Sequence, residues 1–140
     1  MLTGKYNHSV DAKNRIIIPS KLKEQLGEPI TVLKSPSDKC LTLYSKAEGE
    51  IYAEKLSALP RTKMRDAVRY LYANSLEVVP DAQGRIMLPQ EMLDHAGITK
   101  NIVTAGCGRY AEMWSAEVWE ESALDSPPED ITAVLEELGL

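Results

Sequence analysis

The sequence has few of the residues that carry metal or covalent chemistry. It contains two cysteines, Cys40 and Cys107, and two histidines, His8 and His95. The histidines are isolated, neither lies at a metal-ligand spacing from a cysteine, and the chain has no glycine-rich phosphate loop or nucleophile elbow. We therefore expect no metal site, no cofactor and no catalytic residue, and we interpret both cysteines as reduced packing residues.

Long apolar runs are also missing. No apolar stretch approaches the ~20 residues that a membrane span needs, and the first residues lack the apolar core of a signal peptide. We therefore expect a cytoplasmic protein with no membrane partner. The length of 140 residues, with 44% hydrophobic and 26% charged side chains, is typical of one soluble globular domain.

The net charge of −5 is unevenly distributed. Residues 1–70 contain 13 basic and 8 acidic side chains, a net charge of +5, whereas residues 71–140 contain 3 basic and 13 acidic side chains, a net charge of −10. Net charge alone favours an ordinary acidic protein. A polyanion would nevertheless meet the first half more readily, provided that a local basic patch is already shaped for it.

One nine-residue segment occurs twice, 70 residues apart. It reads Asp-Ala-Lys-Asn-Arg-Ile-Ile-Ile-Pro at 11–19 and Asp-Ala-Gln-Gly-Arg-Ile-Met-Leu-Pro at 81–89, and the same offset relates Gly27 to Gly97. A unit of about 45 residues rarely buries a sufficient core alone. We therefore expect two copies that interlock about a pseudo-two-fold axis in a single α+β, β-rich domain.

Each copy is predicted to contain a strand, a turn, a strand, a short helix, a strand, a turn and a strand, which together form a barrel with peripheral helices. The predicted strands are 6–10, 15–18, 30–33, 41–44, 100–104 and 111–114, and the short helices are 20–26 and 90–96. The predicted divisions of the domain are the first copy at 1–48, connecting helices at 49–75, the second copy at 76–119 and an acidic C-terminal helix at 120–140.

Capping signals mark the other helices. Ser45 with Glu48 predicts a helix that runs to about residue 59, and a second helix is expected from about 62 to 73. Ser115 is expected to cap a helix. Ser126, Pro127 and Glu129 predict the start of the last helix, which should dock through an apolar face on its own domain or on a neighbouring subunit. That face contains Ile131, Val134, Leu135 and Leu138.

The turn within each copy has three positions of interest. Its aspartate can accept hydrogen bonds from turn amides, its fourth residue is a type that tolerates positive φ, and its arginine returns within reach of the carboxylate. An ion pair that merely fastens the turn is one interpretation of this pattern. The three positions are Asp11, Asn14 and Arg15 in the first copy, and Asp81, Gly84 and Arg85 in the second.

The doubled Asp-x-x-x-Arg motif, each copy followed by three apolar residues and proline, resembles the signature of the MraZ family of bacterial transcriptional regulators. These are relatives of AbrB-type swapped-hairpin DNA-binding proteins, and the resemblance covers nearly the whole chain. It implies a swapped-hairpin β-barrel, a ring-shaped homo-oligomer and a nucleoid-associated location. It also implies binding to short direct repeats in double-stranded DNA, with repression of the division and cell-wall gene cluster that includes the regulator's own operon.

The resemblance also implies which residues bind DNA. Arg15 and Arg85 offer a planar fork of donors for a guanine edge or a phosphate, and Lys13 adds a point charge. Because the second copy has Gln83 in place of Lys13, we expect Arg15 to dominate. The full predicted set is Lys13, Asn14, Arg15, Gly84 and Arg85 for DNA, Asp11 and Asp81 for support of the turns, and Arg61, Arg65 and Arg69 for secondary DNA or subunit contacts.

Two other functions are compatible with the sequence. An antitoxin-like or scaffolding module would hold a protein partner, for example through the apolar face of the last helix, without reading DNA. A small hydrolase is the weakest hypothesis, because the chain lacks a convergent nucleophile and base. A carboxylate paired with a neighbouring guanidinium also has a lowered pKa, which makes it a poor general acid near neutral pH.

Overall fold

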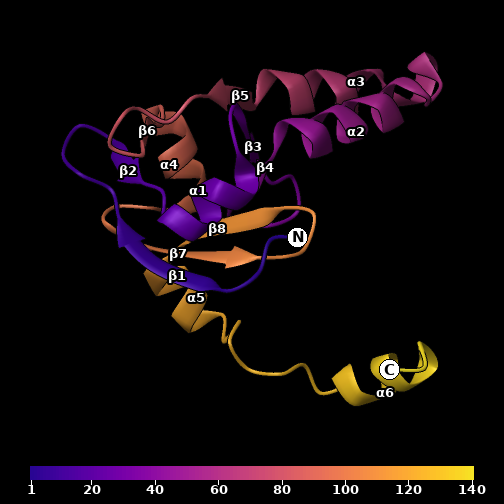
Figure 1. The fold of residues 1–140 in the computed structure, drawn as a ribbon. Coiled ribbons are helices and arrows are strands. Elements are labelled where there is room, and N and C mark those ends of the chain that lie inside the picture. The colour runs from indigo at the N-terminus through magenta and orange to yellow at the C-terminus, as the bar shows by residue number, and fades with distance from the viewer.

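The computed structural model describes the backbone of residues 1–140 and every side chain except that of Lys63. It has an α+β architecture in which short helices flank antiparallel strands (Figure 1). The elements are β1 (Lys5–Ser9), β2 (Arg15–Ile17), α1 (Ser20–Leu26), β3 (Ile30–Lys34), β4 (Leu41–Tyr44), α2 (Lys46–Ser57), α3 (Arg61–Ala73), β5 (Ser75–Val78), β6 (Arg85–Met87), α4 (Gln90–Ala96), β7 (Asn101–Gly106), β8 (Ala111–Ser115), α5 (Ala116–Glu121) and α6 (Ile131–Glu137).

The strands form two sheets rather than the closed barrel that we predicted. Six strands pair antiparallel in the order β1-β7-β8-β4-β3-β5, and β2 pairs only with β6. Pro19 and Pro89 follow β2 and β6 closely, and proline has no backbone N–H with which to extend a ladder. The β2–β6 pair therefore remains a short two-stranded ribbon beside the main sheet.

Strands from the two halves of the chain alternate in these sheets. β1 pairs with β7, β4 with β8 and β2 with β6, so each pairing joins residues that are far apart in the sequence. Ile16 and Ile86 face each other at the centre of the ribbon and are both buried. Leu22 and Leu26 are buried on one face of α1, as their spacing predicts. The core thus holds the ribbon and both short helices in place.

Glycine ends both short helices, as predicted. α1 stops before Gly27 and α4 before Gly97, and both glycines have positive φ, 65° and 64°. The predicted limits of these two helices, 20–26 and 90–96, match the structure residue for residue. This accuracy matters for the site because each helix begins immediately after the ribbon.

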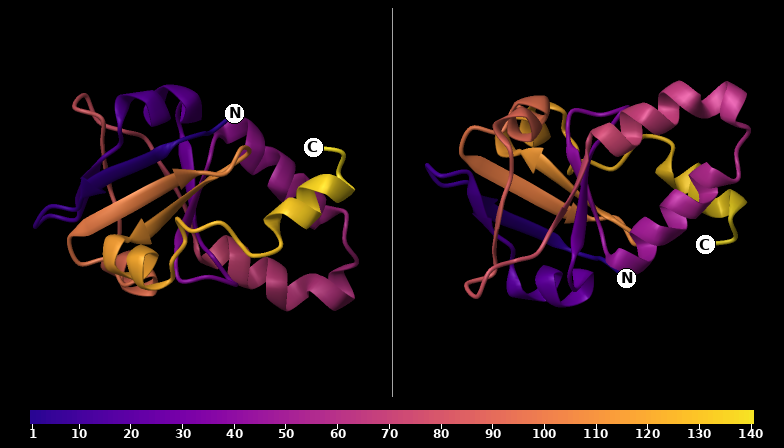
Figure 2. Two further views of the ribbon diagram at one scale, coloured as in Figure 1. Left: turned by 90° about the horizontal axis from the view of Figure 1, so that it is seen from below. Right: turned by 90° about the horizontal axis from the view of Figure 1, so that it is seen from above.

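The helices α2 and α3 form a hairpin that projects from the sheet on the side away from the turns before β2 and β6 (Figures 1 and 2). Ser45 caps α2 by accepting a hydrogen bond from the Glu48 amide, at 3.2 Å, as predicted. The expected inner face of α3 is confirmed as half-buried, and it consists of Met64, Ala67, Val68 and Leu71.

The C-terminal segment differs from the prediction. Ser115 caps α5 as expected, but α6 begins at Ile131 with Asp130 at its N-cap position, so the predicted cap at Ser126 is wrong. The reason is local, because a residue that precedes proline is disfavoured in the helical region, and Pro127 precedes Pro128. All residues from 120 to 140 are exposed, and α6 lies apart from the sheet (Figures 1 and 2).

The two cysteines are not equivalent. Cys40 is buried, as predicted, whereas Cys107 is exposed in the turn between β7 and β8, so its interpretation as a packing residue is wrong. Both thiols are free. Burial raises the pKa of Cys40 to about 12, so this side chain is a neutral thiol at physiological pH. None of the helices described here has the length and apolar composition needed to cross a membrane.

Candidate nucleic-acid interface

The turns that lead into β2 and β6 have nearly the same backbone geometry. Asn14 has φ 59° and Gly84 has φ 76°, so both turns pass through the left-handed region as predicted. The amide of Asn14 donates to the carbonyl of Asp11 at 3.1 Å, and the amide of Gly84 donates to that of Asp81 at 2.9 Å. The duplicated sequence therefore produces two copies of one tight turn.

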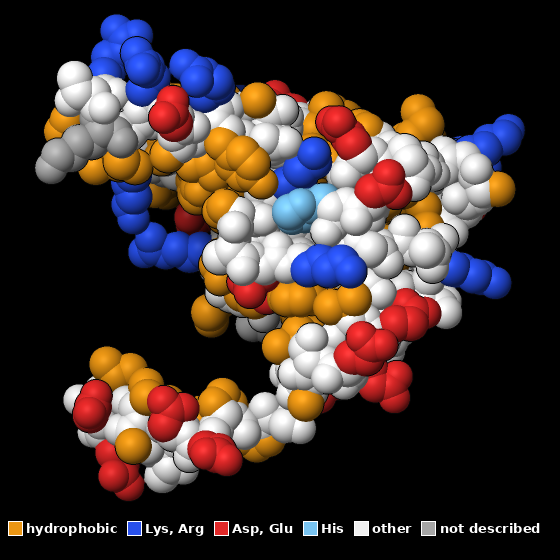
Figure 3. Space-filling model, turned by 180° about the vertical axis from the view of Figure 1, so that it is seen from behind, with side chains coloured by type: hydrophobic (Ala, Val, Ile, Leu, Met, Phe, Trp, Pro, Cys, Tyr) orange, Lys and Arg blue, Asp and Glu red, His pale blue; other side chains and the backbone are white. Residues whose placement is uncertain are grey.

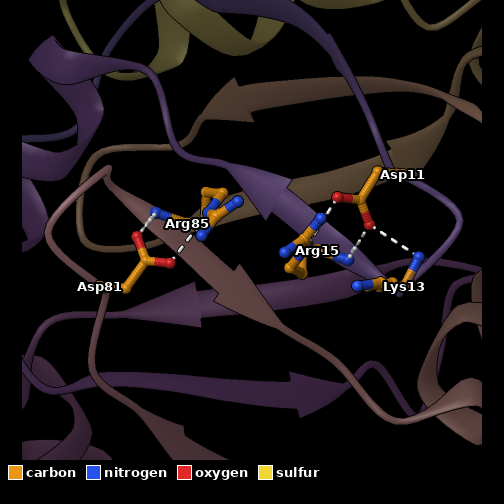
Figure 4. A network of polar contacts seen from close by, with 5 residues as sticks. All are labelled: Asp11, Lys13, Arg15, Asp81 and Arg85. Atoms are coloured by element: carbon orange, nitrogen blue, oxygen red, sulfur yellow. Dashed lines mark hydrogen bonds and ion pairs between the residues drawn. The ribbon is translucent and has the colours of Figure 1, made fainter.

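An aspartate holds each turn through both of its carboxylate oxygens. Oδ1 of Asp11 accepts from the amides of Lys13 and Arg15, each at 2.9 Å, and Oδ2 accepts from Nε of Arg15 at 2.7 Å. Asp81 repeats the arrangement with the Gln83 and Arg85 amides and with Arg85 Nε, all at 2.9 Å. Figure 4 shows the two arginines between the two aspartates.

The hydrogen bonds that hold the turns also set the charge of the aspartates. The Arg15 backbone amide is the main group that lowers the pKa of Asp11, and the Arg85 amide does the same for Asp81. Both carboxylates are therefore ionised at neutral pH and cannot serve as general acids there. This observation removes the main chemical support for the hydrolase hypothesis.

The arginines keep most of their donors free. Within the described part of the chain, Arg15 and Arg85 each use Nε–H for the aspartate, which leaves four N–H donors on the two Nη nitrogens. Their side chains are 33% and 27% exposed, so the carboxylate orients them without covering them. They lie at the first positions of β2 and β6, whereas the exposed residues Lys13 and Gln83 lie nearer the tips of the turns.

The outward face of the β2–β6 ribbon combines these arginines with two apolar side chains. Arg15 pairs with Met87 and Ile17 pairs with Arg85, so the four side chains alternate across one face. Ile17 is 59% exposed and Met87 is 64% exposed. Sequence analysis did not identify Ile17 and Met87 as surface residues, although the two-residue period of a strand places each on the same face as the arginine two positions earlier.

Two depressions flank the ribbon. A cleft of about 420 Å³ is lined by residues that include Arg15, Arg85 and His8. A wider one of about 750 Å³ includes Lys23 of α1 and Gly84, and a Cβ placed on Gly84 would lie 3.8 Å from Lys23 Nζ. Lys23 therefore brings a cation to the second turn, where the sequence has Gln83 instead of lysine. Its helical setting gave no sign of this long-range contact.

The third predicted group of arginines lies elsewhere. Arg61, Arg65 and Arg69 are exposed on α3, in the hairpin, and the structure does not bring them together with the arginines of the ribbon. Basic side chains gather over this hairpin, whereas acidic ones lie on the separate C-terminal segment (Figure 3). Arg69 also forms an exposed ion pair with Asp66 at 3.3 Å.

Replacing Gly84 by alanine is expected to destabilise the protein by about 1–2 kcal/mol because an L-residue must then adopt a positive φ. Space is not the obstacle, since the nearest atoms lie 3.8 Å or more from the added Cβ. Gly84→Asn copies the residue found at Asn14 and should cost less. Thermal unfolding measures both variants, and an equal loss in the two would contradict this explanation.

Comparisons with known proteins place these features in a family. A family model described as "MraZ protein, putative antitoxin-like" matches residues 1–68 and 71–134. A protein from Clostridium tetani, named "Transcriptional regulator MraZ", is 43% identical over 143 residues that cover 100% of both chains. Proteins of the same name from Caldanaerobacter subterraneus subsp. tengcongensis (43% identity, 86% of this chain, 85% of the relative) and Clostridium acetobutylicum (40%, 99% and 97%) are similar.

Proposed function

This chain belongs to the MraZ family, and on that premise we propose that it is a sequence-specific regulator of transcription that binds double-stranded DNA. One observation carries the proposal, namely that the β2–β6 ribbon presents Arg15 and Arg85 on a single exposed face with free guanidinium donors. The major groove of B-DNA admits a two-stranded ribbon, and an arginine fork matches the O6 and N7 atoms of guanine.

Each residue of the interface has a distinct role in this proposal. Arg15 and Arg85 contact base edges, while Lys13 and Lys23 contact phosphates beside the two turns. Asn14 and Gly84 let the backbone turn close to the DNA. Asp11 and Asp81 do not touch the bases, since an ionised carboxylate only accepts hydrogen bonds, but they fix the direction in which each guanidinium leaves the ribbon.

The target follows from the family. We propose that the protein binds short direct repeats upstream of a division and cell-wall gene cluster that includes its own operon, and that it acts as a repressor. Its place of action is then the nucleoid in the cytoplasm. The names of the relatives support a role in transcription and not an enzymatic one.

The proposed architecture is one domain of two interlocked copies, residues 1–48 and 76–119, with linking helices at 49–75 and an appended segment at 120–140. The offset of 70 residues between β2 and β6 and between α1 and α4 supports it. The pairing of strands from opposite halves is what an AbrB-like swapped-hairpin arrangement requires.

We place this domain in a ring-shaped homo-oligomer. The support comes from two unlike surfaces on the same chain. Residues 120–140 contain seven acidic and no basic side chains, and α6 exposes an apolar face. The hairpin contains a groove of about 340 Å³ with an apolar lining and with Arg61 and Arg65 on its wall. A second copy can supply the acidic helix to this groove, with opposite charges facing each other.

A salt titration tests DNA binding directly. We expect the affinity for the protein's own upstream DNA to exceed that for a scrambled duplex, and both to fall as salt rises. Phosphate contacts from Lys13 and Lys23 give a log–log slope of about −2 for each bound subunit, since each neutralised phosphate contributes about −0.9. Gel-shift titration at several salt concentrations measures this. Equal affinity for both duplexes, or none for either, would refute sequence-specific binding.

A protein-binding module without DNA readout is the second candidate. The exposed apolar face of α6 favours it, with Ile131 at 40%, Val134 at 44% and Leu138 at 68% exposure. The matching family description also contains the word "antitoxin-like". This alternative predicts a stable protein partner and no salt-dependent DNA binding, so the same titration distinguishes the two functions.

A further inference from the structure

His8 connects the two sheets beside the candidate interface. It lies half-buried on β1, and its ring reaches two other strands. Nδ1 lies 2.9 Å from the carbonyl oxygen of Ile17 on β2, and Nε2 lies 2.7 Å from the hydroxyl oxygen of Thr104 on β7. Because a carbonyl oxygen only accepts, Nδ1 carries the proton and donates to Ile17, and Nε2 accepts from the threonine hydroxyl.

The surroundings favour this uncharged form of the ring. Thr104 is fully buried, and burial is the main cause that lowers the pKa of His8. The neutral tautomer has one donor and one acceptor, and each is matched by a group of the opposite type. The two bonds therefore satisfy the ring completely and hold it between β2 and β7.

The carbonyl of Ile17 needs a partner from outside the ribbon. The ladder bond next to it runs from the Ile18 amide to the Gly84 carbonyl, at 2.9 Å. Since hydrogen bonds alternate along an antiparallel pair, Ile17 and Arg85 face each other as a non-hydrogen-bonded pair, and the Ile17 carbonyl points away from β6. β1 has already left β2 to pair with β7. The ring of His8 bridges the space between these diverging strands.

The second copy of the motif lacks this bridge. The offset of 70 residues places Val78 where the first copy has His8, and Val78 packs against the core with an apolar side chain. Valine cannot donate to the carbonyl of Met87, the counterpart of Ile17. The fold thus accepts valine at this position in one half, and the histidine is an addition that serves only the strand of Arg15.

We propose that His8 is a positioning residue for Arg15, an inference that rests on the proposed function of the ribbon in DNA binding. By holding the Ile17 carbonyl, His8 fixes β2 against the main sheet two residues from the guanidinium. His8, Ile17 and Arg15 line one cleft, so movement of the strand would change the direction of the arginine. His8 itself does not contact the bases in this arrangement.

Three variants separate the tether from the space that the ring fills. His8→Val copies the second half of the chain and removes both hydrogen bonds. His8→Asn keeps a donor near the position of Nδ1, whereas His8→Gln moves the amide outward toward the position of Nε2. If the bond to Ile17 is what matters, asparagine should rescue and glutamine should not.

The first measurement uses no DNA. Amide hydrogen exchange in the ribbon, read at Ile18, is expected to be about three- to tenfold faster in His8→Val and His8→Gln than in the wild type, and close to the wild-type rate in His8→Asn. An unchanged rate in His8→Val, or a glutamine variant as protected as the asparagine variant, would overturn the tether.

The second measurement compares the protein's own upstream DNA with a scrambled duplex. His8→Val should lose about tenfold in affinity for its own DNA and keep its affinity for the scrambled duplex, while His8→Asn should retain both. A purely structural defect would lower the two affinities together. If the wild type distinguishes the duplexes and His8→Val does so equally well, the positioning role is wrong. If the wild type distinguishes neither, the proposed function fails, and the exchange rates still decide the tether.

Discussion

Replacing Arg15 by alanine is expected to abolish the binding of the protein to its own upstream DNA and to leave the melting temperature within a few degrees of the wild-type value. Each lost bidentate contact to a base costs about 1–3 kcal/mol, and the loss recurs in every subunit bound to the same DNA. Stability should change little because an exposed ion pair contributes only ~0–1 kcal/mol and the Lys13 amide still donates to Asp11. Gel-shift titration and thermal unfolding measure the two quantities.

Two control variants separate the arginine fork from its charge. Arg109→Ala removes the same charge from an exposed position in the turn between β7 and β8, and should bind DNA as the wild type does. Arg15→Lys keeps the charge but loses the planar fork, so it should retain salt-dependent binding with little preference between duplexes. If Arg15→Ala still shifts its own upstream DNA normally, the sequence is read by other residues.

Local structure near the interface could be predicted from the sequence because each feature depends on a few adjacent residues. Proline before α1 and α4 and glycine after them set the limits of both helices. Asn14 and Gly84 indicated the left-handed turns, and the spacing from Asp11 to Arg15 indicated the ion pair. The last helix was mispredicted for a local reason as well, since consecutive prolines outweighed a capping signal at Ser126.

The features that local patterns could not supply depend on contacts between distant segments. β2 pairs with β6, 70 residues away, so nothing near Ile17 indicates that this strand forms a separate ribbon with an exposed apolar side chain. The bond from Thr104 to His8 spans 96 residues. Lys23 reaches the second turn from α1, which reduces the difference between the two motifs that the sequence suggested.

Placing glutamate at two apolar positions of α6, with Leu135→Glu and Leu138→Glu combined, is expected to dissociate the proposed ring. Both side chains are exposed in the single chain, at 39% and 68%, so the fold of the domain should be unaffected. The substitutions instead add charge to the surface that a neighbouring copy would bury. Light scattering should show a smaller particle, and thermal unfolding of the domain should be nearly unchanged.

The same double variant should distinguish assembly from DNA recognition. Several linked subunits on successive repeats raise avidity by ~10²–10⁴, so the variant should lose affinity by that factor on DNA with several repeats and keep its affinity for a single repeat. Ala133→Glu adds the same charge to the opposite side of α6 and should preserve both the assembly and the avidity. An unchanged mass for the double variant would mean that α6 is not the contact between copies. A loss on the single repeat would mean that α6 acts on the ribbon itself, because avidity requires more than one site.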